Sequence, residues 1–123
     1  MFYFFYGSDV DRARARSRAV LDVMKKKRPE AEYFRITSDK YKQTQFEEFI
    51  SGQGLFDRKF IVFVDGVFED KAAKDWILSK IKEIGESENA FVFLEKKSDA
   101  ATKKKVERHS QERSEEHTSE LQS

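Results

Sequence analysis

One uninterrupted apolar run constrains the fold of this chain more than any other feature. It reads Phe60-Ile61-Val62-Phe63-Val64 and ends at Asp65. A strand with one face in water alternates apolar and polar residues, whereas a run without a polar position needs cover on both faces. The run therefore predicts a central parallel strand with helices packed on both sides of the sheet.

Segments of strand and helix character alternate along the rest of the chain, which predicts an α/β fold. We expect strands at residues 2–6, 32–36, 59–65 and 90–94, and helices at 10–28, 44–51, 70–84 and from 99 onward. Ser8 or Asp9 can cap the first helix, Thr44 and Glu47 have the spacing of a capping box, and Gly85 follows the third helix. The predicted architecture is a three-layer parallel sheet of about four strands with flanking helices and right-handed crossovers.

Composition narrows the class of protein. The chain has 123 residues, with 38% apolar and 38% charged residues, which fits one heavily charged globular domain. It has no Cys, so disulfides and thiolate metal sites are excluded and a cytoplasmic location is expected. No apolar run is long enough to span a membrane, and His109 and His117 have no partner at a metal-ligand spacing. The sequence thus predicts no cofactor.

The last eleven residues differ in origin from the rest. Residues 113–123 read R-S-E-E-H-T-S-E-L-Q-S, and all eleven match the in-frame translation of a common short-read sequencing adapter. We therefore expect a non-native tail at 113–123 and a single domain at 1–112 that is incomplete at its C-terminus. The tail holds one of the 24 basic and three of the 23 acidic residues, so residues 1–112 carry 23 and 20, a net charge of +3. That charge is too small to indicate a nucleic-acid ligand by itself.

The turn after the first strand is where a nucleotide would bind in a parallel sheet. A phosphate-binding loop reads G-x-x-x-x-G-K-[ST], whereas residues 7–14 read G-S-D-V-D-R-A-R. The second glycine, the lysine and the hydroxyl are absent, and Asp9 and Asp11 would repel phosphate. We expect no ATP binding here.

The same acidic residues have two interpretations. Asp9, Asp11 and Asp65 follow strands and could converge as a Mg²⁺ site in a receiver-like or nucleotide-handling domain. Alternatively, Asp9 caps a helix and Asp65 opens a turn with Gly66.

The Leu55-Phe56 pair has no obvious place in a regular element. Gly52 and Gly54 make a helix through the pair costly, so we expect it at a helix end or in a loop. The pair either fills the core beneath the sheet or is exposed to bind a partner. Each exposed side chain would gain about 1.5–3 kcal/mol on burial in a partner's pocket.

Three sequence stretches together resemble the N-terminal domain of the delta subunit of bacterial DNA polymerase III, a clamp-loader component. They are the first strand followed by G-S-D, the segment G-L-F-D-R-K leading into F-I-V-F-V-D, and F-V-F-L-E-K-K-S-D near the end. The resemblance covers Met1 to about Glu112. It implies a fold like that of P-loop NTPases of the AAA+ type, without a P-loop and here without the fifth strand.

The resemblance also implies a function in DNA replication. In that family a non-catalytic domain inserts an exposed apolar pair into a pocket of the sliding clamp (the beta subunit) and helps to open it. The matching residues are Leu55 and Phe56, flanked by Gly54, Arg58 and Lys59, for which we expect only steering or orienting roles. The full-length family members also contact the other loader subunits and primed DNA.

Overall fold

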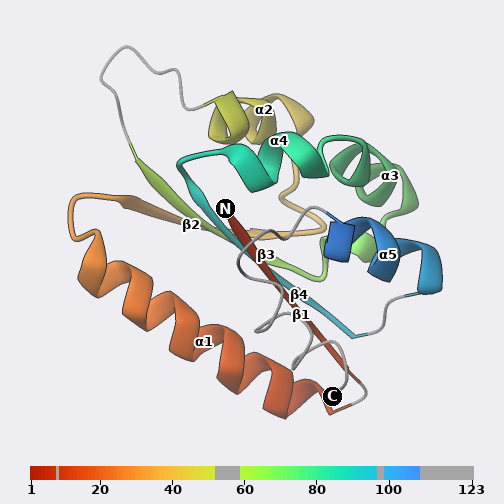
Figure 1. Ribbon diagram of the computed structural model, residues 1–123, viewed down its shortest axis with the longest axis horizontal. Helices are drawn as coiled ribbons and strands as arrows, with labels where there is room; N and C mark the ends of the chain where they lie inside the picture. The colour runs from red at the N-terminus through yellow and green to blue at the C-terminus, as the bar shows by residue number, and fades with distance from the viewer. Residues whose placement is uncertain (8, 52–58, 97–98, 109–123) are drawn as a thin grey trace.

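In the part of the chain that the structure describes, four parallel strands form one sheet (Figure 1). The structure is a computed structural model that describes residues 1–7, 9–51, 59–96 and 99–108. The strands are β1 (Phe2–Tyr6), β2 (Glu32–Thr37), β3 (Phe60–Asp65) and β4 (Ala90–Glu95), in the order β1-β4-β3-β2. The apolar run is confirmed as a central strand, since β3 pairs with both β2 and β4.

Helices cover both faces of the sheet, which confirms the predicted three-layer α/β architecture. In Figure 1, α1 (Val10–Lys27) crosses one face, and the remaining helices lie on the other. These are α2 (Gln43–Ser51), α3 (Lys71–Ser79), α4 (Ile81–Glu86) and α5 (Ala100–Arg108), with a short 3₁₀ helix, η1 (Val67–Glu69), after β3.

The two faces of the sheet build two different cores because side chains alternate along each strand. The α1 side is the smaller core, with Leu21 and Met24 of α1 packed near Phe63 and Val92. The other side is larger and rich in aromatic residues. Its central ring, Phe93, is fully buried and lies with its centroid within 6.4 Å of the centroids of four other Phe rings, those of Phe2, Phe4, Phe68 and Phe91.

The predicted limits of α1 are confirmed. Asp9 is the N-cap residue, and its carboxylate accepts a hydrogen bond from the Arg12 amide at 3.1 Å. The helix ends at Lys27, two residues before Pro29. Three lysines in the last turn, Lys25–Lys27, face the negative end of the helix dipole.

Two details of the helix predictions are wrong. The helix α2 already begins at Gln43, and the Phe46 amide bonds to the Lys42 carbonyl at 3.1 Å, so Thr44 lies inside the helix and does not cap it. The single helix expected at 70–84 is two helices that meet at Lys80. The Lys80 amide bonds to the Ile77 carbonyl three residues back, a tight turn that ends α3, and α4 then runs through Gly85.

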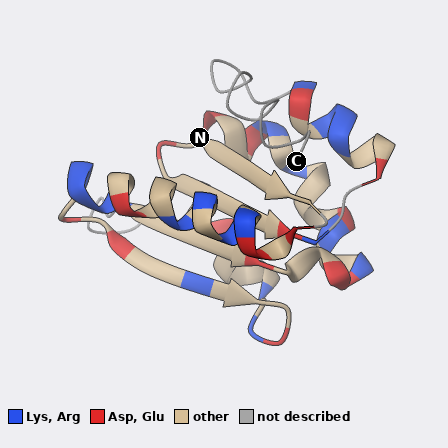
Figure 2. Cartoon of the chain, turned by 90° about the horizontal axis from the view of Figure 1, so that it is seen from below, with Lys and Arg blue, Asp and Glu red and all other residues tan. Residues whose placement is uncertain are grey.

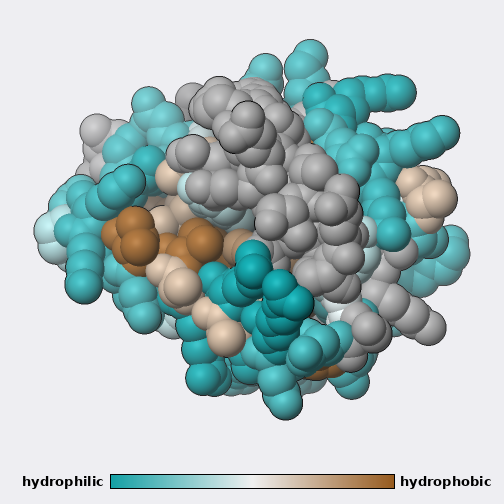
Figure 3. Space-filling view, turned by 60° about the horizontal axis from the view of Figure 1, so that its bottom comes forward, coloured by the Kyte–Doolittle hydropathy of each residue, from teal (hydrophilic) through white to brown (hydrophobic). Residues whose placement is uncertain are grey.

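The described surface is predominantly polar. Lys and Arg alternate with Asp and Glu on the helices (Figure 2), and the face in Figure 3 is mainly hydrophilic with a small apolar area. Val23 and Tyr33 are the exposed large hydrophobic residues among those described. None of the described helices combines the length and apolar character needed to cross a membrane.

We expect Phe93→Ala to lower the free energy of unfolding by about 3–5 kcal/mol, because it leaves a cavity among four packed rings. Urea unfolding followed by circular dichroism measures this loss. The control Val23→Ala, at a residue that is 50% exposed, should change it by less than about 0.5 kcal/mol. Equal losses in both variants would contradict the assignment of the core.

Candidate functional site

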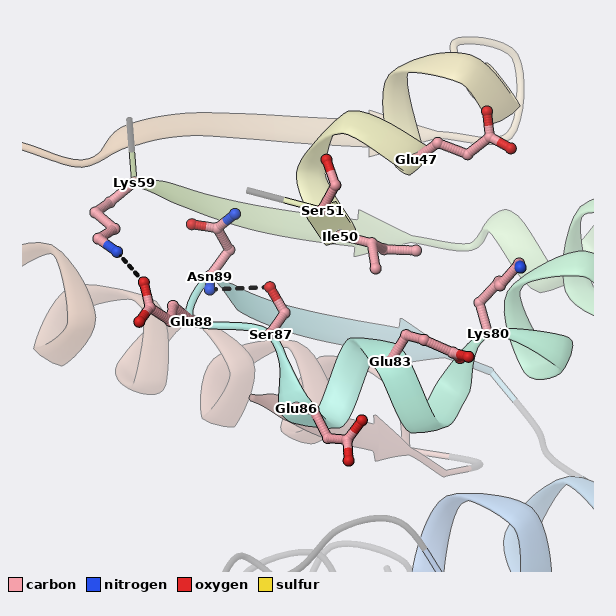
Figure 4. A pocket seen from close by; sticks show the side chains of 10 residues that line it. All are labelled: Glu47, Ile50, Ser51, Lys59, Lys80, Glu83, Glu86, Ser87, Glu88 and Asn89. Atoms are coloured by element: carbon pink, nitrogen blue, oxygen red, sulfur yellow. Dashed lines mark hydrogen bonds and ion pairs between the residues drawn. The ribbon is translucent and has the colours of Figure 1, made fainter. Parts of the chain in front are cut away.

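The predicted clamp-binding residues Gly54, Leu55, Phe56 and Arg58 lie outside the described residues. The structure does describe both ends of the segment that carries them. On one side α2 ends at Ser51, and on the other the chain resumes at Lys59 and enters β3 at Phe60. Both ends lie at the amino-terminal end of the sheet, next to the loop between α4 and β4 (Figure 4).

Asn89, in that loop, holds both ends of the segment. Its side-chain amide donates to the Phe49 carbonyl in the last turns of α2 at 2.6 Å, and its side-chain oxygen accepts from the Phe60 amide at 2.9 Å. The residue is 1% exposed; its hydrogen bond to Phe49 is buried, and the one from Phe60 is partly buried. One side chain thereby links the end of α2 to the start of β3. We call this link the Asn89 brace.

Further contacts fix the chain where the segment returns to the sheet. Lys59 forms an ion pair with Glu88, drawn in Figure 4, and its carbonyl accepts from the Glu32 amide at 3.0 Å. The guanidinium group of Arg28 donates to the Glu88 carbonyl at 2.7 Å. The ion pair with Lys59 lowers the pKa of the Glu88 carboxyl, and the nearby Arg28 adds to this effect. Lys59 is therefore anchored to the α4–β4 loop.

The amino group of Met1 binds to the same loop. It donates to the carbonyls of Ile84, Ser87 and Asn89 at 3.2, 2.5 and 3.0 Å. Ile84 lies in the last turn of α4 and Ser87 is its C-cap residue, a position where the helix dipole favours a positive charge. The α4–β4 loop that contains Asn89 is thus also held by Met1, the residue directly before β1.

A pocket of about 530 Å³ opens beside the brace, between α2, α4 and the first residues of β3. Four carboxylates line it, those of Glu47, Glu83, Glu86 and Glu88, together with the ammonium groups of Lys59 and Lys80 and the apolar Ile50. Figure 4 shows these side chains around the opening. The excess of carboxylates favours a basic rather than an acidic partner at this end of the sheet.

The opposite, carboxyl-terminal end of the sheet contains Asp65. Arg14 and Arg35 approach its carboxylate at 3.0 and 2.7 Å. Burial raises the pKa of Asp65, but the hydrogen bonds and charges of the two guanidinium groups outweigh it and bring the pKa below its ordinary value. Asp9 caps α1, and the described residues contain no group of three acidic or histidine side chains able to hold a metal ion. The structure thus does not join Asp9, Asp11 and Asp65 into a site.

Glu95, the last residue of β4, was not singled out from the sequence. It is 4% exposed, and its carboxylate accepts a hydrogen bond from the Phe68 amide at 3.2 Å. Burial, with smaller contributions from Glu69 and Asp65, raises its pKa to about 8, despite the Phe68 amide and Lys74. At neutral pH this carboxyl is mainly protonated.

Sequence reasoning also missed Asn89, and both omissions have the same cause. The only local signal is a polar residue that directly borders or ends an apolar strand, and such residues are usually exposed. The partners of Asn89 lie 40 and 29 residues away along the chain, and that of Glu95 lies 27 residues away.

Comparisons of the chain with protein-family models, curated proteins and solved structures found no match.

We expect Asn89→Ala to lower the free energy of unfolding by about 2–4 kcal/mol, because it leaves a buried amide and a buried carbonyl without partners. The Phe60 amide should also lose protection against hydrogen exchange. Glu83→Ala changes an exposed residue of the same pocket and should leave both quantities nearly unchanged. Unchanged protection of Phe60 in Asn89→Ala would exclude the brace.

Glu95 should make stability depend on pH. Because its pKa is about 8 in the folded chain and 4.5 in the unfolded chain, its stabilising contribution is complete below pH 4.5. That contribution is lost as the pH rises through 8, by at most about 1.4 kcal/mol per pH unit. Glu95→Gln should therefore gain stability over the natural chain between pH 5 and 9, as measured by urea unfolding. Glu86→Gln, at an exposed position on α4, should follow the natural chain. A constant difference between Glu95→Gln and the natural chain would refute the assignment.

Proposed function

We propose that this chain is a non-catalytic protein-binding module that engages a sliding clamp through Leu55 and Phe56. The proposal starts from the resemblance to the N-terminal domain of the clamp-loader delta subunit. In this proposal the chain contributes to clamp opening during DNA replication and does not hydrolyse ATP. The contacts with other loader subunits and primed DNA, and the cytoplasmic location, belong to the same proposal.

The observation that carries the proposal is the Asn89 brace. A binding segment gains affinity when its ends are held before the partner arrives, because less conformational entropy is lost on binding. Here one buried side chain holds Phe49 and Phe60, on either side of the segment with Leu55 and Phe56. The ion pair between Lys59 and Glu88 adds a second restraint. This degree of support is expected for a segment that presents side chains to a partner.

Two further features support the proposal. The described strands form an all-parallel sheet in the order β1-β4-β3-β2 with helices on both faces, which agrees with the fold that the resemblance implies. At the other end of the sheet, Arg14 and Arg35 already neutralise Asp65, where a magnesium-dependent domain needs an open carboxylate. The clamp-binding interpretation is therefore favoured over the receiver-like or nucleotide-handling alternative.

Binding to a sliding clamp tests the proposal directly. The whole chain is immobilised and clamps from several bacteria are applied in biolayer interferometry. The double variant Leu55→Ala plus Phe56→Ala should bind at least about 100-fold more weakly, because two apolar side chains lose burial worth about 1.5–3 kcal/mol each.

A matched control is Val23→Ala, which shortens an exposed apolar side chain on α1 and should bind like the natural chain. Circular dichroism establishes that each variant is folded. Clamp binding that the double alanine variant retains would reject the role of the pair. A folded natural chain that binds no clamp would reject the function.

A further inference from the structure

A second cavity lies at the carboxyl-terminal end of the sheet, the end where parallel α/β folds usually bind ligands. Its volume is about 420 Å³, within the range of about 300–1,000 Å³ that is typical of small-molecule sites. The described residues that line it come from η1, α3, the end of β4 and the start of α5; they are Phe68, Glu69, Lys74, Glu95, Lys96, Asp99 and Thr102. It is separate from the pocket beside the Asn89 brace.

The charges in this cavity are paired except for one. Lys74 forms an ion pair with Asp99 at 2.9 Å, and Lys96 lies 4.0 Å from Glu69. Glu95, among the described residues, has a single hydrogen bond, from the Phe68 amide, and no ion-pair partner. A carboxyl that is 4% exposed and has no cation beside it is held in its neutral form by burial. The cavity therefore contains a buried acid whose ionised form a cationic ligand would stabilise.

We propose that this cavity binds a guanidinium group, which pairs with the Glu95 carboxylate and packs against the Phe68 ring. The inference does not rest on the proposed clamp binding. The guanidinium group belongs either to an arginine side chain of a partner protein or to a small guanidino compound, and the two sources present the same chemistry to the cavity.

The shape and hydration of the ion select guanidinium over other cations. A guanidinium ion is flat, forms two parallel hydrogen bonds with a carboxylate, and stacks on aromatic rings. It is also less strongly hydrated than an ammonium ion and so loses less on entering a partly apolar cavity. Mg²⁺ and Ca²⁺ require several oxygen ligands, whereas Asp99 and Glu69 already face lysines.

Binding should depend on pH because only the ionised carboxylate pairs with the ligand. Three charged groups act on Glu95, namely Glu69 of η1, Asp65 of β3 and Lys74 of α3, and Lys74 is itself paired with Asp99. The two acids and burial favour the protonated form, and Lys74 opposes them. A bound guanidinium group should thus displace the proton, and affinity should rise from pH 6 to pH 9.

The test uses the whole chain labelled with ¹⁵N and two probes, agmatine and the peptide acetyl-Gly-Arg-Gly-amide. Their lysine-type counterparts, cadaverine and acetyl-Gly-Lys-Gly-amide, are the ligand controls. The Phe68 amide, which donates to Glu95, should shift in the NMR spectrum on titration with at least one guanidino probe at pH 8.5. Glu95→Gln should bind at least tenfold more weakly, whereas Glu86→Gln, at an exposed residue of the other pocket, should bind within about twofold of the natural chain.

Each outcome decides the proposal. Binding of both guanidino probes supports the shared chemistry, and binding of the peptide alone assigns the ligand to a partner protein. Equal binding of the lysine-type probes, or unchanged binding by Glu95→Gln, would overturn it. If Glu95→Gln does not fold, the natural chain still decides, because an affinity that stays constant from pH 6 to 9 excludes Glu95 as the receptor.

Discussion

Two-sided burial of the central strands is the constraint on which the rest of the structure depends. Strand β4 has hydrogen-bonded neighbours on both sides, and all six of its residues are buried. A strand in this position cannot expose any side chain to water, so each face needs helices. Among the described residues, α1 covers one face, and α2, α3, α4 and α5 cover the other. The positions of the helices follow from this need for cover.

The same strand also organises both ends of the sheet. The polar residues at its limits, Asn89 before it and Glu95 at its end, are nearly as buried as the apolar residues between them. Asn89 satisfies its polar groups within the chain, through Phe49 and Phe60. Glu95 does so only in part. The polar residue at one end of β4 thus has its hydrogen bonds within the chain, whereas the residue at the other end is buried with a single hydrogen bond.

The sequence predicted the architecture because its signals are local. The apolar run at β3, Asp9 before α1 and Pro29 after it each act within a few residues. The break at Lys80 was missed because neither Gly nor Pro stands there and the stripe of Ile77, Ile81 and Ile84 is continuous. The partners of Asn89, Glu95 and Asp65 were out of reach because the fold brings them together from distant parts of the chain. The roles of Leu55 and Phe56 remain a prediction from the sequence.

The contact of Arg14 and Arg35 with Asp65 determines what balances the negative charge of this carboxylate. Both counter-ions of this carboxylate belong to the polypeptide, one on α1 and one on β2. Their local concentration is fixed by the fold and does not vary with the supply of divalent ions or nucleotides. The charge of Asp65 is thus balanced by the chain itself, and this carboxylate needs no bound ion to remain ionised in its partly buried position.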